Sequence, residues 1–303
     1  MDIPACSLRT TQSCSLAEFL WEQRCTLLLT EGRGEKLAVL GADREGLIRH
    51  KGLLPGTETA ACRGEQVAAW GRRRLEMLSR GRLLDGRGSG ILGRLLLFGT
   101  NRSSLRPDHL VALQWGRLGL WGMDQGGYGL LDRNGRYTDK SARVPDRTAE
   151  IKLSGMALSE GEPAFLTGHG QEQGQGCIMD AASGEMVMRE LDNPSSPLLI
   201  DTTLYFLEGQ AARITCCDLQ GGGRTTVVRL PGPANGMLRF GEHLLVSLAG
   251  PGAGLCCLHL GSGRLTVLHG RPANSSRLLA AIAGTPRRSR STRASTLATW
   301  ASV

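Results

Sequence analysis

The chain has 303 residues, of which 41% are hydrophobic, and it carries a formal net charge of +8. This length and apolar content suffice for one large core, and no stretch approaches the roughly 18 apolar residues of a membrane-spanning helix. Most of the charge comes from seven Arg residues that follow Glu242, and no aromatic side chains alternate with the basic ones to stack on bases. We therefore expect neither a membrane nor a nucleic acid as partner.

The N-terminal sequence carries no recognisable export signal. It begins MDIPACSLRT, without the positively charged start and apolar centre of a signal peptide. The nine Cys residues include no C-x-x-C pair. These features predict a cytoplasmic protein with reduced thiols, in which residues 1–14 are a disordered lead-in.

A short helix is predicted directly after the lead-in. Ser15 and Glu18 have the S-x-x-E spacing of a capping box, in which the two side chains hydrogen-bond the free backbone N–H groups of the first turn. Leu16, Phe19 and Leu20 would share one face. We expect this helix over about 16–23, packed across the first strands that follow.

One short pattern recurs along the rest of the chain. It consists of about four apolar residues, a polar turn rich in Gly, Ser and Asp, and a second apolar run, and it predicts two strands joined by a tight turn. Five copies are clear, and they lie at 36–48, 128–138, 176–188, 214–228 and 255–268. A weaker sixth copy is expected at 72–81, centred on Leu78.

The spacing of these hairpins predicts the fold class. All-β units repeated at intervals of roughly 40–50 residues are typical of propeller blades, whereas the rival repeats of similar length are helical. Two further strands precede the hairpins, for example 151–158 and 163–170 before 176–188. We therefore predict an all-β fold, a β-propeller of six four-stranded blades with one short N-terminal helix.

The chain after Gly270 is expected to end the propeller. The apolar run at 278–283 is a candidate closing strand, which gives a propeller domain over 15–283. Residues 284–303 are rich in Ser, Thr and Arg and cannot form a core, so a disordered tail is predicted there.

A glycine-rich segment raises the question of a nucleotide site. The sequence GSGILG, with Gly88, Gly90 and Gly93, fits the dinucleotide fingerprint G-x-G-x-x-G. That site needs a helix beginning at the third glycine. The run at 94–100 is short, apolar and ended by Gly99, so a strand is predicted there and the nucleotide interpretation is rejected.

Two pairs of adjacent cysteines recur in successive hairpins, Cys216-Cys217 and Cys256-Cys257. Adjacent residues on a strand point to opposite faces, so the four thiols cannot converge on one tetrahedral metal centre. We expect them in the core, and we expect no metal ion and no cofactor.

Three hairpins place an aspartate directly after the first apolar run, at Asp132, Asp180 and Asp218, and the last hairpin has His259 there. Carboxylates at this place could act as general acids or bases. A structural role is favoured, because Asp in a turn accepts hydrogen bonds from backbone N–H groups two residues further on.

The segments 37–43, 180–185, 193–197 and 204–207 resemble, in this order, an uncharacterised bacterial family of conserved hypothetical proteins. The resemblance covers roughly residues 12–250. Members of that family look like propellers, and some are fused to tetratricopeptide repeats. The resemblance therefore implies a propeller with a shared polar site where the inner strands meet at one mouth of the central channel.

This chain departs from the family at that implied site. Relatives carry Met-Pro-His-Ser-Pro-Arg, Asn-Thr-Arg, Leu-Asn-Gly and Thr-Arg-Gly signatures. The corresponding positions here are 192–198, 122–124, 153–155 and 234–236, where Ser195 replaces the histidine and Leu198 the arginine. The resemblance thus implies a divergent member. Its candidate ligand-binding residues are those that occupy the signature positions, Asp124, Ser154, Asn193, Ser195 and Asn235.

The function expected from these features is a non-catalytic binding or protein-interaction module, with a small molecule or a protein held at the channel mouth. The alternative is a propeller enzyme, a hydrolase, lyase or isomerase acting on a small molecule or peptide. A chain that has lost all activity is a third interpretation. No catalytic residue can be assigned, because no G-x-S-x-G or phosphate-binding loop is present and no base can be paired with Ser154 or Ser195.

Overall fold

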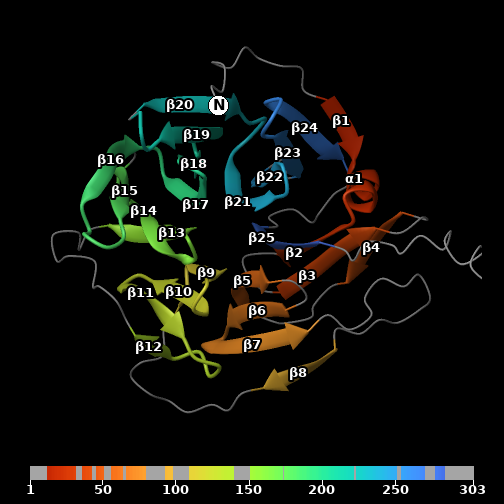
Figure 1. Ribbon diagram of the computed structural model, residues 1–303. Coiled ribbons are helices and arrows are strands. Elements are labelled where there is room, and N and C mark those ends of the chain that lie inside the picture. Colours follow the sequence, from red (N-terminus) through yellow and green to blue (C-terminus); the bar gives the residue numbers. More distant parts are fainter. Residues whose placement is uncertain are drawn as a thin grey trace, which may run out of the picture.

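The computed structural model describes twelve segments of the chain, namely 12–31, 36–42, 46–50, 56–63, 66–79, 93–97, 109–139, 151–172, 174–221, 223–250, 254–269 and 277–283. Within these segments the strands form six sheets placed around a common centre (Figure 1). Five sheets have four strands, and the sixth has an additional fifth strand. We number the sheets in the order in which their hairpins follow along the chain.

The first three sheets come from the first half of the chain, apart from one strand. Sheet 1 consists of β25 (Arg277–Ala283), β2 (Cys25–Glu31), β3 (Lys36–Ala42) and β4 (Leu47–His50). Sheet 2 consists of β5 (Thr57–Arg63), β6 (Gln66–Gly71), β7 (Arg74–Ser79) and β8 (Gly93–Leu97). Sheet 3 consists of β9 (Ala112–Trp115), β10 (Leu120–Asp124), β11 (Gly127–Leu131) and β12 (Tyr137–Asp139).

The second half of the chain supplies the other three sheets. Sheet 4 consists of β13 (Lys152–Ser159), β14 (Glu162–His169), β15 (Gly176–Asp180) and β16 (Met186–Leu191). Sheet 5 consists of β17 (Pro194–Ile200), β18 (Thr203–Glu208), β19 (Arg213–Asp218) and β20 (Arg224–Arg229). Sheet 6 consists of β21 (Ala234–Phe240), β22 (His243–Leu248), β23 (Leu255–His259) and β24 (Arg264–His269), with β1 (Gln12–Ser15) added beside β24.

The first strand of each sheet lies at the centre of the molecule. These inner strands, β25, β5, β9, β13, β17 and β21, each contact the inner strands of both neighbouring sheets, so they form a closed ring (Figure 1). The remaining strands of each sheet follow outward in order. The predicted all-β propeller with four-stranded blades and one short N-terminal helix is therefore confirmed.

Apolar side chains fill the spaces between neighbouring sheets. Sheets 4 and 5, for example, bury Ile178 and Leu191 against Leu204 and Phe206, all of which have 0% exposure. The same packing joins sheets 5 and 6 through a cluster that includes Leu207. Because both faces of a sheet are covered in this way, each sheet depends on its neighbours for burial.

The ring is closed by strands from the two halves of the chain. β25 pairs antiparallel with β2, from Cys25 opposite Ala283 to Thr30 opposite Arg277. This confirms the closing strand predicted at 278–283. A second closure was not predicted: β1 pairs in parallel with β24, with Gln12 opposite Thr266. Residues 12–14, expected in the disordered lead-in, therefore belong to a strand, while residues 1–11 and 284–303 lie outside the described segments.

The helix α1 (Leu16–Glu22) connects these two closures. Its apolar face is confirmed, since Leu16, Phe19 and Leu20 are at most 7% exposed and pack on residues of sheets 1 and 6. The predicted capping box is wrong, because Ser15 occupies the N-cap position but makes no side-chain capping bond. Ser15 is the last residue of β1, and its extended backbone is held opposite β24 instead.

The five clear hairpins are confirmed, and the weak sixth is wrong in its position. Leu78 lies on β7, but β7 pairs with β8 at Gly93–Leu97 and not with a strand inside 72–81. Gly93, the third glycine of the GSGILG segment, begins a strand, as predicted for the apolar run that follows it. The other glycines of that segment lie outside the described residues.

The turn and core predictions for the hairpins are also confirmed. The carboxylates of Asp132, Asp180 and Asp218 accept backbone N–H groups two residues further on, at 2.8, 3.1 and 3.0 Å. His259 also accepts a turn N–H, that of Ser262 three residues further on, at 3.1 Å from Nδ1. The four paired cysteines are at most 9% exposed, and within the described residues no three His, Cys, Asp or Glu side chains are grouped to hold a metal ion.

Hydrogen bonds from sheet 3 add a polar contribution to its contact with sheet 4. Trp121 Nε1 donates to the Gly161 carbonyl at 3.0 Å, and the Tyr128 hydroxyl donates to the Ala181 carbonyl at 2.8 Å. Trp121 and Tyr128 are both buried, and these bonds give the indole N–H and the phenol hydroxyl an acceptor. Within the described part of the chain, no helix has the length and apolar content that crossing a membrane requires.

Two histidine rings of sheet 6 lie near α1. The His243 ring lies 6.0 Å from that of Phe19 and 5.1 Å from that of His259. Burial and the neighbouring His259 lower the pKa of His243 from 6.5, against a weaker opposing effect of Glu242. Because the pKa of His243 is lowered in the folded state, neutral His243 favours folding. This contribution to the free energy of unfolding is present above about pH 6.5 and is lost as the pH falls through the folded-state pKa.

We predict that His243→Phe, which keeps an aromatic ring beside Phe19, reduces the loss of stability on acidification. Urea unfolding at pH 7.5 and pH 5.5 measures the free energy of unfolding of both proteins. The wild type is expected to lose more stability between the two pH values than the variant does. An equal loss in both proteins would show that protonation of His243 does not contribute to the pH dependence of stability.

Candidate functional site

Neighbouring inner strands contact one another near the residues at which they begin. The Ser154 hydroxyl on β13 reaches the carbonyl of Pro194, the first residue of β17. Glu58 on β5 reaches His109, just before β9. The inner strands thus begin at one end of the ring, which we call the rim.

A β-bulge recurs at the rim end of the inner strands. In β5, β13 and β21 the pairing with the second strand skips one residue, which is Glu58, Ser154 or Asn235. In β17 the skip covers Ser196 and Pro197. A bulge leaves the extra residue out of the ladder and turns its side chain. Two of the predicted site residues, Ser154 and Asn235, therefore occupy the same structural position in different sheets.

Ser154 joins sheet 4 to sheet 5. Its Oγ donates to the Pro194 carbonyl at 2.6 Å and lies 3.0 Å from the Oγ1 of Thr167. Pro194 stands between Asn193 and Ser195 in the chain. The structure therefore brings three of the five predicted residues, Ser154, Asn193 and Ser195, to one place on the rim.

Asn235 repeats this arrangement in sheet 6. The Ser247 hydroxyl lies 2.7 Å from Asn235 Oδ1 and 3.3 Å from the Gly236 carbonyl. Ser247 pairs with Gly236 as Thr167 pairs with Gly155, so the two hydroxyl residues are equivalent. Asn235 shares the rim with Ser154 but stands two inner strands away, and its hydrogen bond with Ser247 lies within sheet 6.

Asp124 lies apart from the inner strands. It ends β10, where its Oδ1 accepts the Gly126 N–H at 2.7 Å in the turn to β11. Burial, followed by the charge and hydrogen bonding of Asp124, raises the pKa of Tyr137. The next residue, Gln125, bonds the N–H and the carbonyl of Leu153 at 2.9 and 3.2 Å. Asp124 is therefore a turn residue beside the rim.

Sequence reasoning missed the pair Glu58–His109, whose Oε1 and Nδ1 atoms are 3.0 Å apart. Glu58 occupies the bulge position of β5 that Ser154 and Asn235 occupy in their strands. The signal was available, since Thr57-Glu58-Thr59 aligns with Leu153-Ser154-Gly155 at the start of an inner strand. The weaker sixth copy of the hairpin pattern, which follows in sheet 2, made this alignment hard to recognise.

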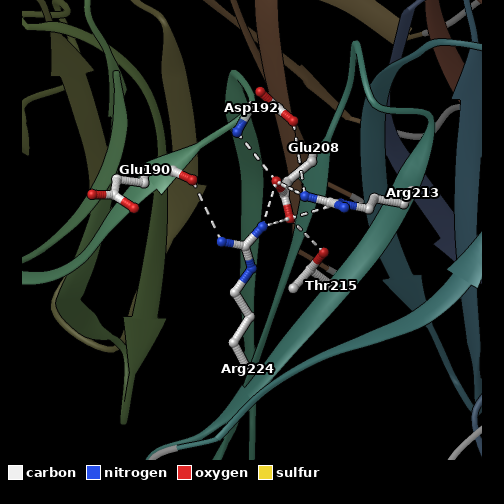
Figure 2. A network of polar contacts seen from close by, with 6 residues as sticks. All are labelled: Glu190, Asp192, Glu208, Arg213, Thr215 and Arg224. Carbon is white, nitrogen blue, oxygen red and sulfur yellow. Dashed lines mark hydrogen bonds and ion pairs between the residues drawn. The ribbon is translucent and has the colours of Figure 1, made fainter. Parts of the chain in front are cut away.

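The second missed feature is a buried carboxylate beside the predicted site. Glu208 ends β18 with 0% exposure (Figure 2). Arg213 donates to it through Nε at 3.0 Å and Nη2 at 2.6 Å, and Thr215 donates at 2.7 Å. Arg224 Nη2 lies 3.0 Å from both carboxylate oxygens. A single charged residue in the apolar run TLYFLE was the only sequence sign of this network.

The network also holds the crossover between sheets 4 and 5, which we define as residues 190–196. The Asp192 N–H donates to Glu208 Oε2 at 3.1 Å, and Arg224 Nη1 lies 3.5 Å from the Glu190 carbonyl (Figure 2). Burial alone would raise the pKa of Glu208. The hydrogen bonds from Arg213, Thr215 and Asp192 and the charge of Arg224 outweigh it, so that this pKa is lowered from 4.5.

The rim arrangement suits recognition through hydrogen bonds more than bond cleavage. Ser154 donates its proton to a backbone carbonyl, and its described partners include no base that could accept that proton during nucleophilic attack. Asn193, Ser195 and Asn235 are neutral and only partly buried. They offer donors and acceptors without a charge.

Comparisons with known proteins agree with an uncharacterised family and with the fold. Residues 144–253 match the model of a family described as Domain of unknown function (DUF4915). That range contains Ser154, Asn193, Ser195 and Asn235 but not Asp124. The resemblance inferred from the sequence is thus confirmed as one to an uncharacterised domain family. A search of the curated proteins found no match.

Among solved structures, the chain is similar to one in a crystal structure of a nidogen/laminin complex. The TM-score is 0.57 with 14% sequence identity, and the alignment covers 85% of this chain and 97% of that one. The fold is a β-propeller. At this identity the likeness concerns the fold alone.

We predict that Ser154→Ala lowers the free energy of unfolding by about 1–3 kcal/mol, because the Pro194 carbonyl loses its donor at a partly buried site. Ser159→Ala, at the other end of the same strand, is the control and should change it by less than about 0.5 kcal/mol. Urea unfolding measures both. Equal effects of the two substitutions would contradict a linking role for Ser154.

Proposed function

We propose that this protein is a non-catalytic interaction module that binds a protein partner on the rim. The observation that carries the proposal is the bulge repeated in β5, β13 and β21, which sets a polar side chain at the same place in each strand. Bulges are frequent at barrel rims and next to active sites, where they re-aim side chains. The proposed contact residues are Ser154, Asn193, Ser195 and Asn235, with Asp124 at the margin.

The bonding of the rim residues supports binding over catalysis. An enzyme should bring several ionisable groups with perturbed pKa values to one place. In the described part of the rim, the Ser154 hydroxyl instead bonds a backbone carbonyl, Asn235 bonds the Ser247 hydroxyl, and Glu58 pairs with His109. Their geometry is held before a partner arrives, which lowers the ordering cost of binding.

The class of partner is proposed from the fold. The similar solved structure is described as a nidogen/laminin complex, so a propeller of this kind occurs in a complex of two proteins. A rim built from neighbouring sheets suits such a partner, since stable protein interfaces bury about 800 Å² on each side. The proposal includes a cytoplasmic location.

Site-specific photo-crosslinking in cell extract tests the proposal. A photoreactive amino acid replaces either Ser195 on the rim or Thr202, an exposed residue in the turn at the opposite end of β17. We predict a protein adduct from position 195 and none from position 202. Adding Asn235→Ala should lower the yield at position 195 several-fold, because it removes a neighbouring contact.

Two results would contradict this proposal. The same adducts from both positions would indicate nonspecific capture, and adducts confined to position 202 would place the interface at the other end of the ring. A small molecule that raises the melting temperature of the wild type but not of the Asn235→Ala variant, without any protein adduct, would replace the protein partner by a small ligand.

A further inference from the structure

The geometry points to Glu208 as a positioning residue for the rim. Its buried carboxylate holds the crossover 190–196, and with it Asn193 and Ser195, in the conformation that the rim presents (Figure 2). This role deepens the proposed function, because it explains how a site assembled from two sheets keeps one shape. It can nevertheless be tested without the partner.

Groups of the protein itself occupy all the hydrogen-bond acceptor sites of the Glu208 carboxylate. Four groups from three segments donate to it: Arg213 and Thr215 on β19, Arg224 on β20, and the backbone N–H of Asp192 in the crossover. Two oxygens have about four lone-pair sites, so these donors use the whole acceptor capacity. Glu208 therefore has nothing left to offer to an outside ligand, and its effect on the rim is indirect.

The crossover needs such support because its backbone is strained. Glu190, Asn193 and Ser196 have φ values of 59°, 53° and 50°, in the left-handed region that residues other than Gly rarely adopt. Conformations of this kind persist only where the surroundings over-determine them. Three left-handed residues within seven positions indicate that contacts elsewhere hold this segment.

Two of the contacts that hold the crossover depend on Glu208. One is the Asp192 N–H that donates to its carboxylate, and the other is the bond from Arg224 to the Glu190 carbonyl, since Glu208 fixes the guanidinium that makes it. The third contact, from Ser154 to Pro194, is independent of Glu208. The crossover is thus anchored at its first half by Glu208 and near its end by Ser154.

The negative charge matters as well as the shape. Arg213 and Arg224 both point at the carboxylate, and Asp192 lies 3.8 Å from Arg213. Replacing Glu208 by Gln keeps the volume but gives one acceptor oxygen instead of two and adds an NH2 donor that faces two guanidinium groups. We expect the two arginines to separate, which releases the Asp192 and Glu190 contacts together.

Hydrogen exchange of backbone amides, measured by mass spectrometry, tests this role. We predict that Glu208→Gln accelerates exchange about tenfold in peptides covering 189–197, while peptides covering 152–158 and 233–240 keep their wild-type rates. The matched control is Glu76→Gln, because Glu76 is also buried, at 9% exposure, and pairs with one arginine, Arg74, in sheet 2. The control should leave 189–197 unchanged.

A merely structural role would give a different pattern. If Glu208→Gln accelerates exchange evenly in all sheets, or leaves 189–197 as protected as in the wild type, the inference is overturned. Should Glu208→Gln fail to fold, Arg224→Lys replaces it, since Arg224 is 37% exposed and Lys keeps the charge without the second nitrogen that reaches Glu190. Faster exchange limited to 189–193 would then support the inference, and unchanged exchange would overturn it.

The same variant separates this inference from the proposed function. Crosslinking from position 195 should weaken in Glu208→Gln and not in Glu76→Gln if both are correct. Faster exchange without any partner adduct in the wild type would retain the positioning role and reject the binding proposal. A normal adduct at position 195 with unchanged exchange in Glu208→Gln would retain the binding proposal and reject the positioning role.

Discussion

The structure depends on closure of the ring of inner strands. A radial sheet has two apolar faces, and each is covered only if a neighbouring sheet stands on that side. The first and last sheets therefore have to meet, and they do so because β25 supplies the inner strand of sheet 1 beside β2. The pairing of β1 with β24 and the packing of Leu16 and Leu20 between sheets 1 and 6 reinforce the same junction.

Closure also creates the candidate site. Inner strands that stand side by side begin at a common rim, and bulges at that end of β13 and β21 turn Ser154 and Asn235 out of the ladder. The crossover between sheets 4 and 5 is bonded by Ser154 from one side and by Glu208 from the other. The rim is therefore a consequence of the ring and of a few polar side chains that bind backbone atoms across sheets.

Local patterns predicted most of the fold, because strands and tight turns are determined by neighbouring residues. The hairpin at 176–188 and the turn role of Asp180 follow from such patterns. Contacts between distant segments did not follow: nothing near Gln12 indicates a partner at Thr266, and the donors to Glu208 range from Asp192 to Arg224. The family resemblance indicated the rim residues, while their mutual contacts required the three-dimensional register of the bulges.

Removal of the closing strand tests the central claim most directly. A chain ending at residue 276 lacks β25, whereas a chain ending at residue 283 keeps it. Thermal unfolding followed by circular dichroism should show a cooperative transition with the full-length midpoint for the longer chain and no such transition for the shorter one. A shorter chain that unfolds cooperatively at the full-length midpoint would contradict the claim that the ring must close for the sheets to be stable.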